Sequence, residues 1–116
     1  MSNPWRSPKR KQKEIGATGV QAKCVEYARR HGWWARKFVS PSNRSVTDYL
    51  FAKVINGVKV KPAVEFKRKG KSCSEAQLDE QRLMREAGWD VYVIDDVEDF
   101  KVLFRSFEQA TPEWLK

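Results

Sequence analysis

The Asn56-Gly57 pair constrains the fold of this chain more than any other feature of its sequence. Asn-Gly is the strongest short signal for a β-hairpin, because a type I′ turn needs a positive φ angle at both central residues. A two-residue turn also fixes the register of the strands on either side of it. We therefore expect residues 46–71 to form a hairpin in which Ile55 faces Val58 and the numbers of facing residues sum to 113.

This register sorts the hairpin residues onto two faces of a sheet. One face is apolar apart from Lys53 and is the predicted core face; it collects Tyr49, Phe51, Ile55, Val58, Val60, Val64 and Phe66. The other face is mixed and places Asp48 directly opposite Glu65, with Lys67 two residues further along. Two facing carboxylates repel each other unless a cation lies between them, so we expect a divalent metal ion there. Pro62 cannot donate to a strand ladder, which predicts a bulge or a sheet edge, and a bulge would shift the pairing by one residue.

The composition is that of one basic domain. The chain has 116 residues, and 23 basic against 15 acidic side chains give a net charge of +8. Such a charge favours a polyanionic partner, most often nucleic acid, although many basic proteins owe their charge to solubility. No apolar run approaches the ~20 residues of a membrane span and no apolar signal segment opens the chain, so we expect a cytoplasmic protein with no membrane partner. Two cysteines without a CxxC pattern and a single histidine leave oxygen as the metal ligand, which suggests Mg²⁺ or Mn²⁺.

The remaining sequence predicts an α/β domain with a mixed β-sheet. A basic N-terminal arm at residues 1–17 is followed by the domain at residues 18–110 and a C-terminal tail at residues 111–116. Besides the hairpin, apolar periodicity and helix-ending glycines predict three helices and two strands. The predicted helices are 19–30, 74–87 and 97–107, and the predicted strands are 33–39 and 89–95.

Two of the predicted helices carry polar side chains of interest. In the first, Gln21 lies beside the apolar face, whereas Glu26 lies on the opposite, solvent side. In the second, Ser74 and Gln77 fit a capping box, in which the serine caps the helix and the glutamine reaches back. The expected apolar positions of the second helix are Leu78, Leu83, Met84 and Ala87. The expected inward positions of the last helix are Phe100, Leu103, Phe104 and Phe107.

The spacing of Asp48, sixteen residues and then Glu65-Phe66-Lys67 resembles the motif of the PD-(D/E)XK nuclease superfamily. Further motifs over about residues 18–100 are similar to those of its VRR-NUC (virus-type replication and repair nuclease) family. They are Gly32, Lys37-Phe38-Val39-Ser40-Pro41, Asn43-Arg44, Val64-Glu65-Phe66-Lys67, Ser74-x-x-Gln77 and Gly88-Trp89-Asp90-Val91. The resemblance implies a restriction-endonuclease-like fold, a mixed sheet with flanking helices. Compact members of the family come mostly from phages and bacteria, so a phage-encoded protein would act in the cytoplasm of its bacterial host.

The resemblance also implies roles for particular residues. Asp48 and Glu65 match the metal-binding acids, and the carbonyl of Phe66 would add a further ligand. Lys67 matches the lysine that positions or activates the attacking water. Gln77 matches a glutamine near the active site, in addition to its capping role.

The sequence departs from the family pattern at two places. Before the aspartate, where Gly-x-Pro-Asp is usual, it has Ser45-Val46-Thr47-Asp48. On the first helix, where the family has a glutamate, it has Gln21, and Glu26 points the wrong way to replace it. An amide oxygen can contact a metal ion or its water but carries no charge. Metal affinity would therefore be lower, or a second metal site would be lost.

The residues and the resemblance together predict a metal-dependent, structure-selective DNA endonuclease that hydrolyses phosphodiester bonds. The resemblance implies a homodimer that cuts four-way (Holliday) junctions, and candidate interface residues are Trp33, Trp34 and Trp114. Besides the N-terminal arm, five basic residues are expected to bind the DNA backbone: Lys37, Arg44, Arg68, Lys69 and Lys71. No base-reading motif is visible, so recognition by DNA shape is expected.

Two alternatives stay open. One is a non-catalytic or weakly active DNA-binding protein on a nuclease fold, for which Gln21 is the main support. The other is a nuclease that acts on flaps or single strands. Intact Asp48, Glu65 and Lys67 argue against the first alternative.

Overall fold

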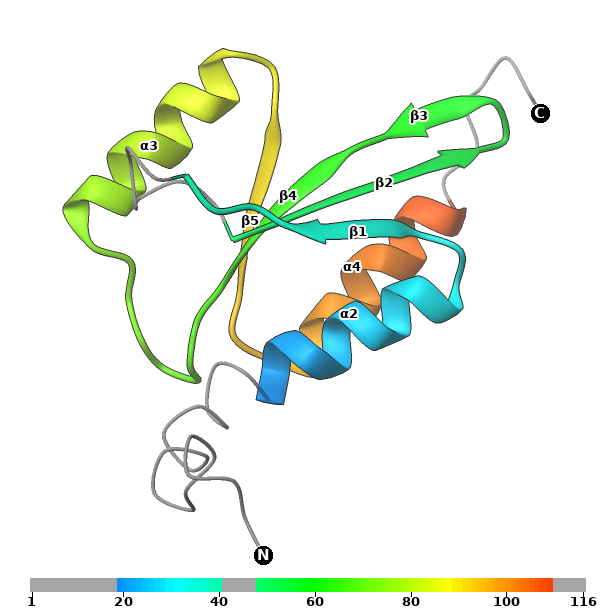
Figure 1. The fold of residues 1–116 in the computed structure, drawn as a ribbon, viewed down its shortest axis with the longest axis horizontal. Helices are drawn as coiled ribbons and strands as arrows, with labels where there is room; N and C mark the ends of the chain where they lie inside the picture. Colours follow the sequence, from blue (N-terminus) through cyan, green and yellow to red (C-terminus); the bar gives the residue numbers. More distant parts are fainter. Residues whose placement is uncertain (1–18, 41–47, 110–116) are drawn as a thin grey trace, which may run out of the picture.

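The computed structural model describes residues 19–40 and 48–109, in which the predicted α/β class is confirmed (Figure 1). The elements are α2 (Val20–Arg30), β1 (Trp34–Lys37), β2 (Tyr49–Ile55), β3 (Val58–Val60), β4 (Pro62–Phe66), α3 (Glu75–Glu86), β5 (Asp90–Ile94) and α4 (Val97–Gln109). They match the predicted elements in type and order, except that the second hairpin strand is divided into β3 and β4, and they differ from the predicted elements at their ends. No helix in these two ranges is long and apolar enough to cross a membrane. The predicted arm and tail, together with Arg44 and Trp114, lie outside the described residues.

Strand β4 lies inside a five-stranded mixed sheet. The strand order is β1-β2-β4-β5, and β3 also pairs with β2. Strand β4 runs antiparallel to β2 and parallel to β5. All five residues of β4 are buried, because β4 has a strand on each side and helices over its faces.

The hairpin register predicted from the Asn56-Gly57 turn is confirmed. Asn56 and Gly57 have φ angles of 52° and 79°, as a type I′ turn requires. Ile55 faces Val58 before the break at Lys61, and Tyr49 faces Val64 after it, so the sum of 113 holds on both sides. The prediction of a bulge at Pro62 is therefore wrong, because the strand pairing is not shifted there. Pro62 begins a new strand instead, a position that a proline can occupy.

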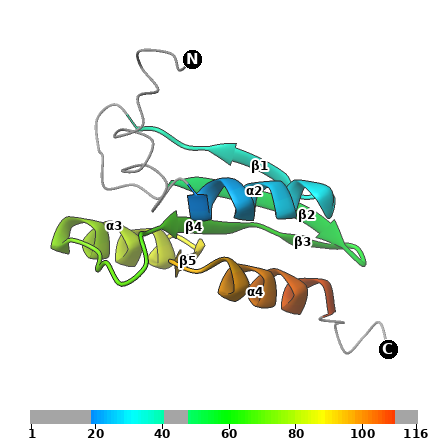
Figure 2. The ribbon, with the colours of Figure 1, turned by 90° about the horizontal axis from the view of Figure 1, so that it is seen from below.

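The apolar core lies between one face of the sheet and helices α2 and α4, which pack side by side (Figure 1). The rings of Phe100 and Phe104 on α4 stack with their centroids 4.0 Å apart, and both contact Phe51 of β2. The predicted core face of the hairpin is confirmed except at Val58, which stays partly exposed. Helix α3 lies toward the opposite end of the sheet from α4 (Figure 2).

Helix α3 covers the other face of the sheet through a polar side. Gln81 is 2% exposed, and Gln77 and Met84 are partly buried, so the inward positions follow a spacing of four and three residues. Three positions expected to be apolar and inward are instead exposed: Leu78, Leu83 and Ala87. Helix α3 is therefore rotated about its axis relative to the prediction, so that glutamines face the sheet. We attribute this orientation to the hydrogen bonds of Gln77 and Gln81, because leaving a buried polar group unpaired costs more free energy than exposing a leucine.

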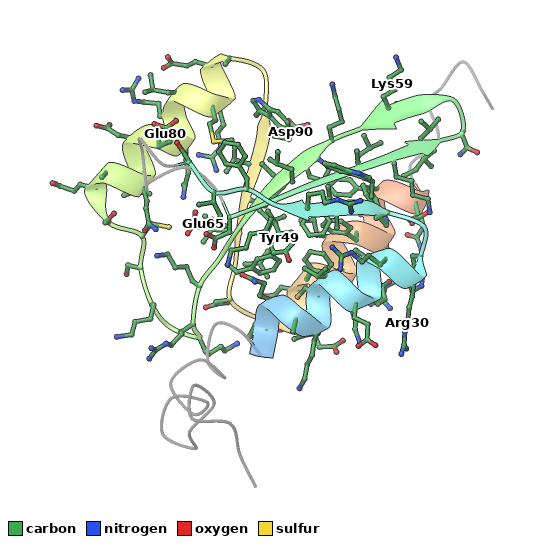
Figure 3. The ribbon with its side chains drawn as sticks, viewed as in Figure 1. Arg30, Tyr49, Lys59, Glu65, Glu80 and Asp90 are labelled. Atoms are coloured by element: carbon green, nitrogen blue, oxygen red, sulfur yellow. The ribbon has the colours of Figure 1, made fainter. Side chains whose placement is uncertain are left out.

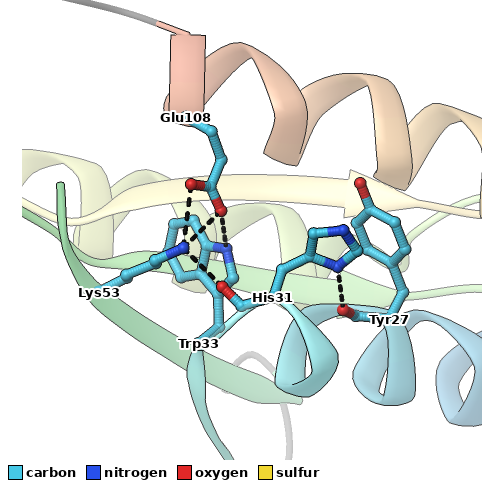
Figure 4. A network of polar contacts seen from close by, with 5 residues as sticks. All are labelled: Tyr27, His31, Trp33, Lys53 and Glu108. Carbon is cyan, nitrogen blue, oxygen red and sulfur yellow. Dashed lines mark hydrogen bonds and ion pairs between the residues drawn. The ribbon is translucent and has the colours of Figure 1, made fainter.

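The lysine on the core face is paired with the end of α4 (Figure 4). Lys53 Nζ donates to Glu108 Oε1 at 2.9 Å and Oε2 at 2.8 Å, and also to the carbonyl of His31. Trp33 Nε1 donates to Glu108 Oε2 at 3.0 Å. Burial alone would raise the pKa of Glu108, but the hydrogen bonds from Lys53 and Trp33 hold that pKa below its usual value. We call Lys53, Glu108 and Trp33 the Lys53–Glu108 clamp. The expectation that Trp33 lies at an interface is wrong, because Trp33 is 3% exposed.

Candidate active site

Asp48 and Glu65 meet where strands β2 and β4 stop pairing. Their last pair is Tyr49 with Val64, and the next facing pair would be Asp48 with Glu65. At this point the Phe66 N–H donates to Asp48 Oδ2 at 3.2 Å, so a side chain takes the place of a strand carbonyl. The Asp48 carbonyl in turn accepts the Phe38 N–H at 2.7 Å. Asp48 is thus fixed from both neighbouring chain segments, within electrostatic reach of Glu65.

Glu65 is a buried acid with one oxygen that lacks a partner. The residue is 3% exposed and lies between the sheet and α3 (Figure 3). Its Oε2 accepts from Gln77 Nε2 at 3.2 Å, whereas its Oε1 accepts from no N–H or O–H donor in the part of the chain that the structure describes. A proton shared between Glu65 and Asp48 would form a hydrogen bond between the two carboxyl groups. An unpaired buried carboxylate oxygen is energetically costly. A cation at this point would remove that cost.

Burial raises the pKa of both acids. The pKa of Glu65 rises to about 7, first because burial disfavours the charged form and second because the Asp48 charge repels it. The pKa of Asp48 is also raised by burial, although the Phe66 N–H and the charges of Lys37 and Lys67 act in the opposite direction. The pair would therefore hold a proton near neutral pH unless another positive charge replaced it.

Lys67 is held beside the two acids by Gln77. Lys67 Nζ donates to Gln77 Oε1 at 2.8 Å, and the same oxygen accepts the Ser74 N–H at 2.9 Å. The Gln77 N–H donates to Ser74 Oγ at 3.1 Å, which completes the predicted capping box. One glutamine thus serves the helix start and the candidate site together.

The loop after β4 is anchored to the turn between β5 and α4. The Gly70 N–H donates to Asp95 Oδ2 at 3.1 Å, and Lys69 Nζ donates to Asp96 Oδ1 at 3.2 Å. Sequence reasoning did not assign a role to Asp95 or Asp96. The signal that could find them is the parallel pairing of β4 and β5, because parallel strands end at the same edge of a sheet.

The basic residues predicted to bind DNA fall into three groups. Lys37, Arg68 and Lys71 are exposed around the candidate site. Lys69 is exposed as well but forms an ion pair with Asp96. Arg44 lies outside the described residues.

Helix α2 contributes no hydrogen bond to this cluster within the described ranges. Gln21 is partly buried on α2, which packs mainly on α4 and β1. Glu26 is exposed and pairs with Arg30 at 3.0 Å, which confirms its predicted solvent side. The structure therefore brings Asp48, Glu65, Lys67 and Gln77 together from the ends of the hairpin strands and from α3. The role predicted for Gln21 stays a prediction.

The oxygen donors at this point suit a hard divalent cation. They comprise the carboxylates of Asp48 and Glu65 and the nearby backbone carbonyl of Phe66, which are ligands that Mg²⁺ and Mn²⁺ prefer. The described residues contain no group of three or more His, Cys, Asp or Glu side chains that could bind a metal ion. An ion here would therefore need the carbonyl and water as additional ligands. The unpaired Glu65 Oε1 fits such an ion.

No family model matches the sequence, and a search of curated proteins found no match. The resemblance to the VRR-NUC family therefore rests on the motif residues of the chain itself.

Proposed function

We propose that this protein is a metal-dependent DNA endonuclease with a PD-(D/E)XK-type site, as its resemblance to the VRR-NUC family predicts. The observation that carries the proposal is the buried Glu65 carboxyl group, whose Oε1 has no partner. A purely structural acid satisfies both oxygens, as Glu108 does in the clamp. A metal-binding acid must instead keep an oxygen available.

Asp48, Glu65 and the carbonyl of Phe66 would hold Mg²⁺ or Mn²⁺. The bound ion would polarise the scissile phosphate and lower the pKa of a bound water. The Phe66 N–H fixes the Asp48 carboxylate through Oδ2. Gln77 fixes the Glu65 carboxylate through Oε2, so both acids are oriented before substrate arrives.

Lys67 supplies a positive charge and a proton donor next to this pair. The bond from Lys67 Nζ to Gln77 Oε1 holds the ammonium group in place. From there Lys67 would orient the attacking water and counter the negative charge that develops on the phosphate. The exposed side chains of Lys37, Arg68 and Lys71 would bind the DNA backbone around the site.

We further propose that two copies act together on branched DNA, with the four-way junction as the expected substrate. A two-fold dimer carries two identical sites, which suits a substrate that needs two matched cuts. The sheet face beside α3, which none of the described helices covers around Trp34 and Val54, offers apolar surface for such a contact. Trp34 is 48% exposed there and Val54 is 64% exposed, and both line a hollow of about 530 Å³.

The competing function is a non-catalytic or weakly active DNA-binding protein, and Gln21 in place of the family's glutamate favours it. Within the described residues, Gln21 makes no hydrogen bond to the cluster and brings no charge to it. If the missing glutamate is essential for metal binding, the protein would bind branched DNA without cutting it. A nuclease that acts on flaps or single strands differs only in its substrate.

One experiment separates these functions. Labelled four-way junction, flap, duplex and single-stranded DNA are incubated with the protein and Mg²⁺, Mn²⁺ or EDTA. Asp48→Ala and Lys67→Ala are compared with Lys23→Ala, which removes an exposed lysine on α2 away from the cluster. We expect metal-dependent cleavage of the junction that Lys23→Ala retains and the other two variants lose.

Two results would decide against the proposal. Cleavage that persists in EDTA or in Asp48→Ala contradicts the metal mechanism. Tight DNA binding without cleavage under either metal supports the non-catalytic function. Preference for a flap or a single strand over the junction would keep the chemistry and change the substrate.

A further inference from the structure

The side-chain amide of Gln77 has a defined orientation. Its Oε1 accepts from Lys67 Nζ and from the Ser74 N–H, and its Nε2 donates to Glu65 Oε2. Reversing the amide would place Nε2 against two donors and Oε1 against a carboxyl oxygen. All three hydrogen bonds would be lost, so only one orientation satisfies these partners.

The capping box restrains this amide from the helix side. Ser74 has the extended backbone of an N-cap residue, with φ −72° and ψ 166°. Its N–H holds Gln77 Oε1, while its Oγ holds the backbone N–H of Gln77 at 3.1 Å. A glutamine side chain loses conformational entropy when it is fixed, and the box supplies part of the energy that offsets this loss. Ser74 itself makes no hydrogen bond to Glu65 or Lys67 in the described structure.

The oriented amide also separates Lys67 from Glu65. Lys67 lies close enough to the acids for its charge to lower the pKa of Glu65 and of Asp48. Without the amide, the ammonium group would be free to pair with one of these acids. A direct ion pair would then occupy the carboxyl oxygens that a metal ion needs. With the amide in place, Nε2 occupies Oε2 of Glu65 and Oε1 stays available.

We propose that Ser74 is a positioning residue of the candidate metal site. Through the capping box it holds Gln77 as a spacer that keeps Lys67 off Glu65 and leaves Glu65 Oε1 for the ion. This inference rests on the metal-binding part of the proposed function. A serine that only caps α3 would stabilise the helix by ~1 kcal/mol and leave metal affinity unchanged.

The first test measures Mn²⁺ affinity by titration, with folding checked by circular dichroism. Ser74→Ala removes the Oγ acceptor, and we expect its Mn²⁺ dissociation constant to rise about tenfold, in the range known for outer-shell partners of metal sites. Ser74→Thr keeps the acceptor and should stay within about twofold of the wild type. Glu108→Gln is the matched control, because Glu108 accepts hydrogen bonds from Lys53 and Trp33 in the clamp, on the core side of the hairpin. It should lower the melting temperature without changing Mn²⁺ affinity.

The second test needs no metal ion. In nitrogen-15 NMR spectra of the metal-free wild type, the two Gln77 side-chain amide protons should be well separated and slow to exchange. Ser74→Ala should bring them toward the values of a free glutamine, and Ser74→Thr should not. Unchanged Mn²⁺ affinity in Ser74→Ala overturns the inference, and so does a free Gln77 amide in the wild type. A wild type that binds no Mn²⁺ overturns the proposed function, whereas the amide spectra still report whether Ser74 orients Gln77.

Discussion

Two lysine–carboxylate clusters lie on opposite faces of the same hairpin, and they differ in whether their acid is satisfied. In the Lys53–Glu108 clamp, both oxygens of Glu108 accept hydrogen bonds, and the pKa of Glu108 is lowered. In the candidate site, the lysine binds an amide instead of the acid, Oε1 of Glu65 stays unpaired, and the pKa of Glu65 rises to about 7.

The difference separates a satisfied ion pair from a buried acid that keeps one oxygen without a donor in the same small protein. The clamp ties the end of α4 to β2 and to the turn after α2, so its bonds contribute to stability. The candidate site lowers stability, because a buried acid without a full set of partners is unfavourable. Such a cost is typical of sites that are kept for function.

The largest expected effect is on cleavage. Lys67→Ala should lower the initial rate on junction DNA by about 10²–10⁴-fold, because it removes the group that orients the water and counters the phosphate charge. Lys53→Ala should lower the melting temperature and leave the rate near that of the wild type at a temperature where the variant is folded. An equal loss of rate in both variants would erase the distinction between the clusters.

The second effect is on stability in EDTA. Glu65 has a folded pKa of about 7 against an ordinary value of 4.5, so the folded state binds the proton more tightly than the unfolded state. Stability therefore falls as pH rises from about 4.5 to about 7. Glu65→Gln removes this loss and should be more stable than the wild type by up to ~3 kcal/mol at pH 8, with little difference at pH 4.

Urea unfolding at the two pH values measures this effect. Adding Mn²⁺ should stabilise the wild type at pH 8 far more than Glu65→Gln. A variant that is less stable than the wild type at pH 8 in EDTA would show that Glu65 is a satisfied structural acid.

The third effect is a pH dependence of stability opposite in sign to that of Glu65. The lowered pKa of Glu108 means that its stabilising contribution is present above pH 4.5 and is lost as pH falls through the folded pKa. Glu108→Gln should therefore lose ~1 kcal/mol at pH 7, as expected for a partly exposed ion pair with a further hydrogen bond. The loss should disappear near pH 3 in thermal melts. A loss that does not depend on pH would mean that packing, and not charge, holds the clamp.

The smallest effect tests whether α2 belongs to the site. Gln21→Glu restores the acid that the family pattern has on the first helix, and we expect a few-fold faster cleavage at limiting Mn²⁺. Glu26→Ala, which removes an exposed acid from the same helix, should leave the rate unchanged. If Glu26→Ala slows cleavage and Gln21→Ala does not, the choice of Gln21 as the site residue on the first helix is wrong.

The sequence was sufficient for features that depend on local geometry. The Asn56-Gly57 turn sets the register of both paired parts of the hairpin, so the placement of Asp48 across from Glu65, one step beyond the last pair, follows by counting. The capping box at Ser74 and Gln77 involves residues of a single helix turn and was also predicted correctly.

The sequence was insufficient where a contact joins distant elements. The resemblance placed Gln77 near the active site, but its hydrogen bond with Lys67, and that of Gly70 with Asp95, depend on how β5 pairs with β4 and how α3 packs on the sheet. No turn specifies that parallel register. The prediction of which side of α3 is buried was wrong for the same reason. Polar partners on the sheet determine that side, and Leu78 does not.

The unbroken register through Lys61 and Pro62 limits how the length of this hairpin can vary. A single residue inserted between Gly57 and Glu65 would move Glu65 to the core side and Phe66 to the side of α3. Two residues, one added to each strand, would lengthen the hairpin and keep both side chains in place. We therefore expect length differences among proteins that share this hairpin to occur in matched pairs, with one residue added to each strand.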